Sequence, residues 1–167
     1  MLLKNKIAVV YGAGGSIGGA VAIAFVREGA KVFLAGRTRP GLERVAKEIS
    51  EAGGWSHIGE VEAFDDQGID MDVDTVVKQA GCIDVTFNAI AIDDSIQGTP
   101  LIELSPAAVG QPVMQRVMTN FLTARAAARH MIRKGAGVIL MITATPARVA
   151  WPLTGSFGIK GAAITGR

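Results

Sequence analysis

Residues 7–20 read IAVVYGAGGSIGGA, and this stretch decides the fold. Residues 7–11 are rich in branched apolar side chains, which predict a buried strand. Four glycines and a serine follow within residues 12–18, and from Ile17 the apolar spacing becomes helical. Such a turn brings a helix N-terminus beside the strand end, where unpaired N–H groups and the positive dipole end suit a pyrophosphate. The alternative is a glycine-rich turn that binds nothing, but a position directly after the first strand favours ligand binding.

Each small residue of this turn has an expected role. Gly12 allows the tight turn, Gly14 and Gly15 let the backbone approach the phosphates, and Gly18 lets the helix pack on the strand. The Ser16 hydroxyl can donate a hydrogen bond to a phosphate. The expected phosphate-binding set is therefore Gly12, Gly14, Gly15, Ser16, Ile17 and Gly18.

The bulk properties predict one globular domain over residues 1–167, with 49% hydrophobic and 19% charged residues. A net charge of +2 on scattered basic residues argues against a nucleic-acid partner. Cys82 is the single cysteine, and His57 and His130 lack ligand spacing, so no metal site is expected. Residues 1–6 are too short and charged for a signal peptide, and no apolar run is long enough to span a membrane. We therefore expect a soluble cytoplasmic protein.

The second expected strand, residues 31–35, is followed by Gly36-Arg37-Thr38-Arg39. An acidic residue at this strand end would hold the adenosine ribose hydroxyls of NAD. Here Gly36 is followed by two arginines, and a guanidinium pairs with a 2′-phosphate bidentately. The turn predicts NADP binding through Arg37, Thr38 and Arg39. The alternative is a solvated basic turn.

The remaining residues alternate between helical and strand patterns. We expect helices over 41–52, from Asp72 or Asp74 to Gly81, over 113–134 and from 155 to 167. Further strands are expected within 57–64, over 83–87 and over 138–142, with irregular chain at 93–111 and a loop at 143–154. This alternation predicts an α/β fold, a doubly wound parallel sheet (Rossmann fold) with strand order 3-2-1-4-5 and its ligand at the carboxyl ends of strands 1 and 4.

With this layout the chain resembles the first two-thirds of a short-chain dehydrogenase/reductase. The glycine turn has the family's longer spacing, with Tyr11 where the family has Thr and Ser16 where it has the middle glycine. The resemblance implies that Asp65 faces the adenine amino group, although a helix N-cap or turn role explains this carboxylate equally well. It also implies that Asn88 and Ala89 correspond to part of the family's Asn-Asn-Ala-Gly motif beside the cofactor.

The resemblance implies chemistry by a Ser, a Tyr and a Lys, supported by an Asn in the long helix. Counting back from Lys160 places Ser156 at the Tyr position and Thr143 at the Ser position, and Asn120 is the supporting Asn. The resemblance further implies that Lys160 holds the cofactor ribose. An alkanol is several pKa units weaker as an acid than a phenol, so Ser156 does not replace the family's general acid.

Two functions follow as expectations. The first is an NADP-dependent oxidoreductase acting on a small carbonyl or alcohol substrate, and the second is a catalytically silent NADP-binding module or partner subunit. The long helix at 113–134 carries an expected apolar face of Val117, Phe121, Ala124, Ala128 and Met131. In the family this helix packs against its copy in a partner, so we expect a homo-oligomer. Family members also continue beyond the region of resemblance.

Overall fold

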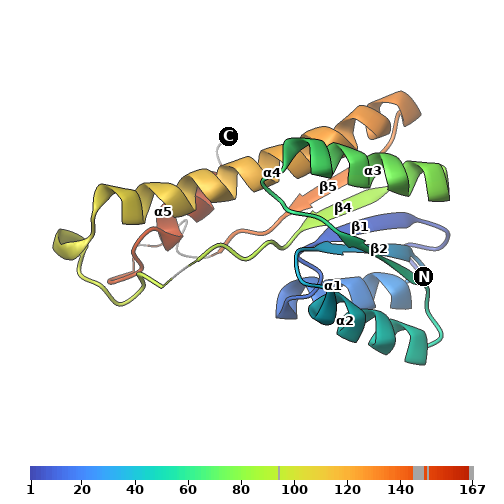
Figure 1. Cartoon of the computed structure of the whole chain (residues 1–167), viewed down its shortest axis with the longest axis horizontal. Helices are drawn as coiled ribbons and strands as arrows, with labels where there is room; N and C mark the ends of the chain where they lie inside the picture. Colours follow the sequence, from blue (N-terminus) through green and yellow to red (C-terminus); the bar gives the residue numbers. More distant parts are fainter. Residues whose placement is uncertain (94, 145–148, 150, 166–167) are drawn as a thin grey trace.

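The computed structural model describes residues 1–93, 95–144, 149 and 151–165. Its sheet has five parallel strands in the order β3-β2-β1-β4-β5, which confirms the predicted order (Figure 1). The strands are β1 (Ile7–Tyr11), β2 (Lys31–Gly36), β3 (Ser56–Glu60), β4 (Val85–Asn88) and β5 (Val138–Met141). Parts of the expected loop at 143–154 and the last two residues of the expected helix at 155–167 lie outside the described residues.

The helices cover both faces of the sheet and make three layers (Figure 1). On one face lie α1 (Ser16–Arg27) and α2 (Arg39–Glu51), and on the other α3 (Asp66–Ala80) and α4 (Pro106–Lys134). A short 3-10 helix, η1 (Leu101–Glu103), precedes α4, and α5 (Phe157–Ala162) follows β5. Helices on both faces of a parallel sheet define the doubly wound architecture that the sequence predicts.

The central strand β1 is buried along its whole length and separates two apolar cores. Val9 and Tyr11 belong to the core beneath α3 and α4, whereas Ala8 and Val10 belong to the core beneath α1 and α2. This division follows from the two-residue period of a strand, which sends successive side chains to opposite faces. A continuous apolar run is therefore what a strand covered on both faces requires.

Two predicted helix starts are wrong. Helix α3 begins at Asp66 rather than at Asp72 or Asp74, and Asp66 places a negative charge in the first turn, where the helix dipole favours it. Helix α4 begins at Pro106 rather than at residue 113. The Ser105 side chain accepts a hydrogen bond from the Ala108 N–H, and Pro106 at the first position needs no N–H partner. The expected irregular chain at 93–111 is therefore helical in its last part.

The predicted apolar face of α4 is also wrong, because only Met131 of its five residues is buried. The side of α4 that meets the sheet carries small, hydroxyl and amide residues together with two larger apolar ones: Thr119, Asn120, Leu122, Thr123, Ala126, Ala127 and Met131. Small side chains let the helix axis approach the strands closely. Val117 and Phe121 instead face outward and are 37% and 51% exposed.

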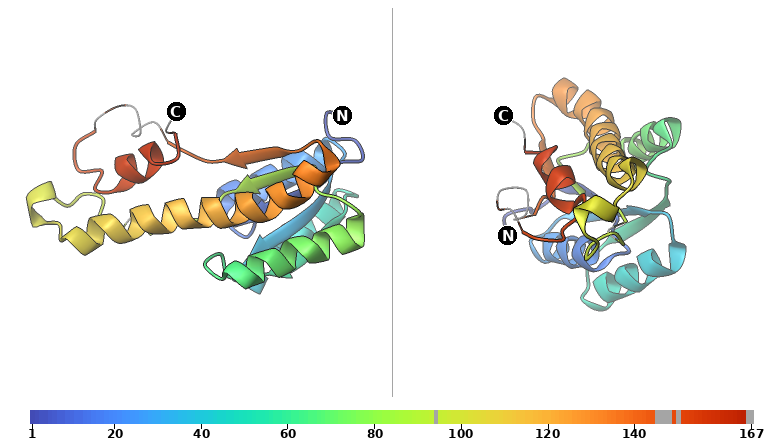
Figure 2. Two further views of the ribbon diagram at one scale, coloured as in Figure 1. Left: turned by 90° about the horizontal axis from the view of Figure 1, so that it is seen from above. Right: turned by 90° about the vertical axis from the view of Figure 1, so that its left-hand side faces the viewer.

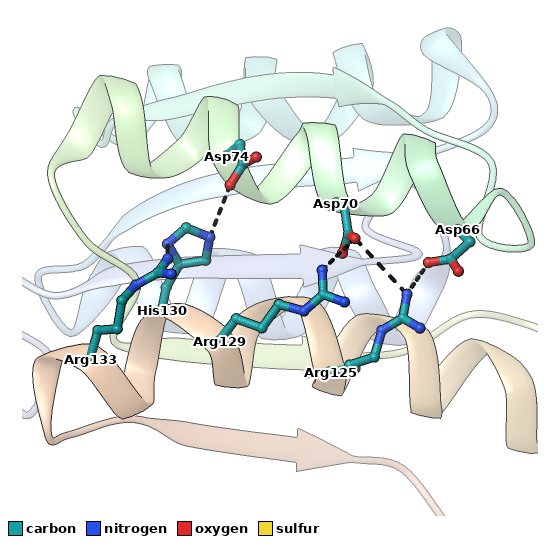
Figure 3. A network of polar contacts seen from close by, with 7 residues as sticks. All are labelled: Asp66, Asp70, Asp74, Arg125, Arg129, His130 and Arg133. Carbon is teal, nitrogen blue, oxygen red and sulfur yellow. Dashed lines mark hydrogen bonds and ion pairs between the residues drawn. The ribbon is translucent and has the colours of Figure 1, made fainter.

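A row of ion pairs joins α3 to α4 (Figure 3). Asp66 pairs with Arg125, Asp70 pairs with Arg129 at 2.5 Å, and Asp74 contacts His130 at 3.0 Å. The three aspartates are four residues apart on α3, a spacing that aligns side chains on one helix face. These contacts hold the C-terminal half of α4 beside α3, while the N-terminal half extends past the strand ends toward α5 (Figure 2).

Within the described ranges, no helix is long and apolar enough to cross a membrane. The same residues contain no group of three or more His, Cys, Asp or Glu side chains that could hold a metal ion.

Candidate functional site

Two adjoining cavities lie at the carboxyl ends of the strands. Cavity A, of about 470 Å³, is lined by residues of the β1–α1 turn, the segment after β4, α4 and α5, together with Ile142, Thr143 and Ala144. Cavity B, of about 460 Å³, is lined by the β1–α1 turn, the turn after β2 and residues 61–64. Both cavities include Gly15 and residues 89–92 in their walls, so they form one continuous groove. The groove lies where doubly wound folds bind ligands.

The glycine turn brings backbone to this groove as the sequence predicts. Gly12 has φ +74°, and a Cβ there would lie 2.6 Å from the carbonyl oxygen of Ala89, so only glycine fits. Gly12 and Gly14 line cavity B, and Gly15 lines both cavities. Gly18 lies behind the turn, where a Cβ would come within 2.2 Å of the Gly12 carbonyl oxygen. Its role is therefore to pack α1 against the turn.

The N-terminus of α1 opens into cavity A. Ser16 is the first residue of the helix and is exposed, and both Ser16 and Ile17 line the cavity. The first turn of α1 contains no acidic residue, so nothing there neutralises the positive end of the helix dipole. This combination is suited to binding an anion.

The two arginines after β2 have different surroundings. Arg37 and Thr38 line cavity B, and the Arg37 guanidinium lies 3.9 Å from the carboxylate of Glu62. Arg39 is instead bound by two carboxylates, Glu43 at 2.8 Å and Glu60 at 2.7 Å, and does not line the cavity. Of these two arginines, Arg37 is therefore the one that faces cavity B.

Asp65 and Asn88 are placed apart from the cavity walls, whereas Ala89 lines both cavities. Asp65 is the N-cap residue of α3 and lines a separate hollow between β3 and α3. The buried Asn88 side chain donates to the Thr119 carbonyl at 3.1 Å and to the Thr123 hydroxyl at 3.0 Å. Asn88 thus joins the end of β4 to α4, next to the groove.

Lys160 and Thr143 come together in the wall of cavity A. The Lys160 side chain is buried, and its ammonium donates to the Asp93 carbonyl oxygen at 3.2 Å. Burial lowers the pKa of Lys160, and the Asp93 carboxylate partly offsets this effect. The Thr143 hydroxyl donates to the Gly161 carbonyl at 3.1 Å.

Asn120 and Ser156 are buried beside the walls rather than in them. The Asn120 amide donates to the Arg116 carbonyl at 2.8 Å, while its side-chain oxygen has no partner among the described residues. The Ser156 hydroxyl is fully buried and also lacks a partner within the described part of the chain. The single tyrosine, Tyr11, donates its hydroxyl to Asp72. None of the residues that line cavity A is therefore a tyrosine.

One charged residue of cavity A is absent from the predicted site. Arg116 lines the cavity and donates to the Ile90 carbonyl at 2.9 Å. It lies one helical turn before Asn120, so helical spacing from the predicted Asn120 is the signal that could have found it. Its burial lowers the pKa of the guanidinium.

The comparisons agree with this fold. The sequence profile described as short chain dehydrogenase matches residues 6–165. An uncharacterized oxidoreductase of Mycobacterium tuberculosis is 27% identical over 97% of this chain and 61% of its own length. The crystal structure of an NAD+-bound xylitol dehydrogenase is 25% identical with a TM-score of 0.88, over 98% of this chain and 62% of that one. A metagenomic short-chain oxidoreductase in complex with NADP is 26% identical with a TM-score of 0.86, over 99% of this chain and 74% of that one. The chain thus spans about three-fifths of the length of this Mycobacterium tuberculosis relative.

Proposed function

The chain belongs to the short-chain dehydrogenase family, and we propose that it binds NADP(H) and acts as an oxidoreductase on a small carbonyl or alcohol substrate. The observation that carries this proposal is the continuous groove over the strand ends. It joins a glycine turn, an unneutralised helix N-terminus and Arg37 at one side to Lys160 and Thr143 at the other.

The residues of the groove fit a dinucleotide. The glycine turn and the N-terminus of α1 would hold the pyrophosphate, because their N–H groups supply donors and the helix dipole supplies positive potential. Cavity B would hold the adenosine half and cavity A the nicotinamide half, since the two cavities meet at Gly15. When bound, this cofactor supplies or accepts the hydride.

The preference for NADP over NAD rests on the turn after β2. Gly36 places no carboxylate at the end of β2, and Arg37 faces cavity B. The Glu62 carboxylate is near enough to attract Arg37 but contacts it only at 3.9 Å with both side chains exposed. An exposed pair of this kind contributes little, so a 2′-phosphate can take over the guanidinium.

In this mechanism the chain's own residues bind and orient the reactants. Lys160 supplies a buried positive charge at the wall of cavity A and is placed to hold a ribose hydroxyl. The hydroxyl of Thr143 can turn from the Gly161 carbonyl to a substrate oxygen. The apolar walls of cavity A, among them Ile90 and Phe157, exclude water from the reacting atoms.

A specific observation favours the second function, a silent NADP-binding module. The position expected to supply a phenol is Ser156, whose hydroxyl is buried without a partner among the described residues. Among the residues that line cavity A, only the Lys160 ammonium approaches the acidity of a phenol, because the Arg116 guanidinium does not lose its proton in proteins. Cofactor binding and hydride transfer are therefore separate questions for this chain.

One experiment tests cofactor binding and hydride transfer separately. The full chain is titrated with NADPH and NADH, using the change in cofactor fluorescence, and is then mixed with a panel of aldehydes and ketones in a single-turnover assay. Tighter binding of NADPH together with its oxidation supports the oxidoreductase. Tighter binding without oxidation supports the silent module. The absence of binding to either cofactor contradicts both.

We also propose that the chain self-associates through the outer face of α4. This face exposes Met114, Val117, Phe121 and Ile132, and large exposed apolar groups of this kind mark interaction surfaces. A monodisperse monomer in light scattering at micromolar concentration would contradict the proposal.

A further inference from the structure

Cavity A contains an unusual balance of charge. Its fifteen lining residues include two cations, Arg116 and Lys160, and no aspartate or glutamate. The remaining walls are mostly apolar, with Ile90, Ile92, Ile142 and Phe157 among them. Positive charge in a small apolar cavity lacks the hydration it has in water, so an entering anion is attracted more strongly than at an exposed site.

The charged groups of Lys160 and Arg116 have different polar partners. Lys160 is committed to the Asp93 carbonyl and to the proposed cofactor site. Arg116 donates to the Ile90 carbonyl and forms no ion pair with any described residue. A guanidinium has five N–H donors in a fixed plane, so donors remain after the bond to Ile90 is made.

The bond to Ile90 also fixes where the guanidinium lies. The Ile90 N–H donates to the Asn88 side-chain oxygen at 3.0 Å, so the segment after β4 is held at both its N–H and its carbonyl. The backbone of Arg116 is also held, because its carbonyl oxygen accepts a hydrogen bond from the Asn120 side chain. A half-buried cation tethered in this way is already oriented before a ligand arrives, which lowers the ordering cost of binding.

From this arrangement we infer that Arg116 binds a substrate anion in cavity A, apart from the phosphate group proposed at the N-terminus of α1, and that this substrate anion is a carboxylate, which the guanidinium pairs with. This inference rests on the proposed function, because it assigns a substrate class to the same site. A planar carboxylate matches the guanidinium fork. Cavity A, of about 470 Å³, would have to hold this acid together with the nicotinamide half of the cofactor, so the acid is a small one.

The test uses two probes of nearly equal shape, 4-carboxybenzaldehyde and its methyl ester. Each is titrated by calorimetry into the full chain, with saturating NADP+ and without it. The wild-type chain should bind the acid at least tenfold more tightly than the ester. Arg116→Met should remove this preference while leaving the affinity for the ester within about twofold, because the change removes the charge and keeps an unbranched apolar stem.

Two controls keep the outcome interpretable. Arg116→Gln retains a donor for the Ile90 carbonyl, so it should also lose the preference for the acid even if Arg116→Met does not fold. Direct titration with NADP+ should give the same affinity for wild type and both variants. If the variants bind NADP+ more weakly but keep the preference for the acid, the anion at Arg116 is a cofactor phosphate and the inference is wrong.

Equal affinity of the wild-type chain for acid and ester, or no binding of either, would also overturn the inference while leaving NADP+ binding intact. A preference for the acid that depends on Arg116 in a chain that binds no NADP+ would support the anion site and overturn the proposed function instead.

Discussion

The Tyr11 hydroxyl donates a hydrogen bond to the Asp72 carboxylate across 3.2 Å, which joins the end of the central strand to the middle of α3. Tyr11 is almost completely buried, and burial together with the Asp72 charge raises the pKa of its phenol well above the usual range. The phenol therefore stays protonated and acts as a donor. This contact gives a structural reason for a tyrosine immediately before Gly12.

The same contact predicts a pH dependence of stability. Burial raises the pKa of Asp72 to about 6, although the Tyr11 bond and the charge of His57 oppose the shift. An acid whose pKa is higher in the folded state binds more protons there than in the unfolded state. Stability from this group is therefore present at low pH and is lost as the pH rises from about 4 to about 6, by roughly 2–3 kcal/mol.

Asp72→Asn tests this account, because asparagine can still accept the Tyr11 hydrogen bond but does not ionise. We expect the free energy of unfolding of the variant, relative to wild type, to rise by roughly 2–3 kcal/mol between pH 4 and pH 7. Urea unfolding at several pH values measures it. The matched control is Asp65→Asn, at an exposed carboxylate that begins the same helix. If the curves for Asp72→Asn and wild type run parallel, Asp72 does not titrate in this range.

A second prediction concerns the 2′-phosphate. Arg37→Ala should weaken NADP(H) binding roughly tenfold or more and leave NAD(H) binding unchanged, because the charge-assisted bonds involve only the extra phosphate. Arg39→Ala should have a smaller effect, since Glu43 and Glu60 already hold that guanidinium. Fluorescence titration of both variants with both cofactors measures the difference. An equal loss of affinity for NADPH and NADH in Arg37→Ala would show that Arg37 does not bind the 2′-phosphate.

A third prediction is that one substitution at the N-terminus of α1 raises or preserves stability and lowers cofactor affinity. Ser16→Asp places a negative charge where the helix dipole favours it, so the free energy of unfolding should stay the same or rise by about 0.3–1 kcal/mol. The same charge should repel the pyrophosphate and reduce cofactor affinity at least tenfold. Ser16→Asn, which has the same shape without the charge, is the control. Unchanged affinity in the folded Ser16→Asp variant would mean that the pyrophosphate does not lie at this helix end.

The order of the sheet could be predicted from the sequence because local patterns determine it. Residues 7–11 are apolar on both faces, which a strand covered on both sides requires, and the glycines after them permit the turn into a helix. Each crossover is long enough to contain a helix and to return parallel to the preceding strand. Gly12 is a single-residue example of a local pattern that determines structure, since its positive φ and its close approach to Ala89 follow from the turn itself.

The facing of α4 could not be predicted in the same way. Val117 and Phe121 have the spacing of a core face, but Thr119, Thr123 and Ala127 are the residues that meet the sheet. Which stripe is buried depends on how closely the helix must approach the strands, and this is a property of the assembled layers. Helical spacing from Asn120 could have pointed to Arg116, but that this cation lies inside a cavity depends on the walls around it, which only the assembled layers provide.

The last prediction concerns proton transfer. Ser156 stands where the family's phenol is expected and its hydroxyl is buried without a partner among the described residues, so it is neither acidic enough nor placed to protonate a carbonyl. Positioned proton transfer supplies about 10²–10⁴-fold in rate, and reduction by the wild-type chain should be slow by a factor of this order. Ser156→Ala should leave that slow rate unchanged.

Ser156→Tyr should raise the single-turnover rate of NADPH oxidation with a carbonyl compound, provided that the ring is accommodated. Ser156→Phe adds the same ring without the hydroxyl, so a gain seen with Tyr and not with Phe would assign the effect to the phenol. Fast wild-type reduction that survives Ser156→Ala would place the acid elsewhere in the chain, and a rate lost with Ser156→Ala would show that the serine itself transfers the proton.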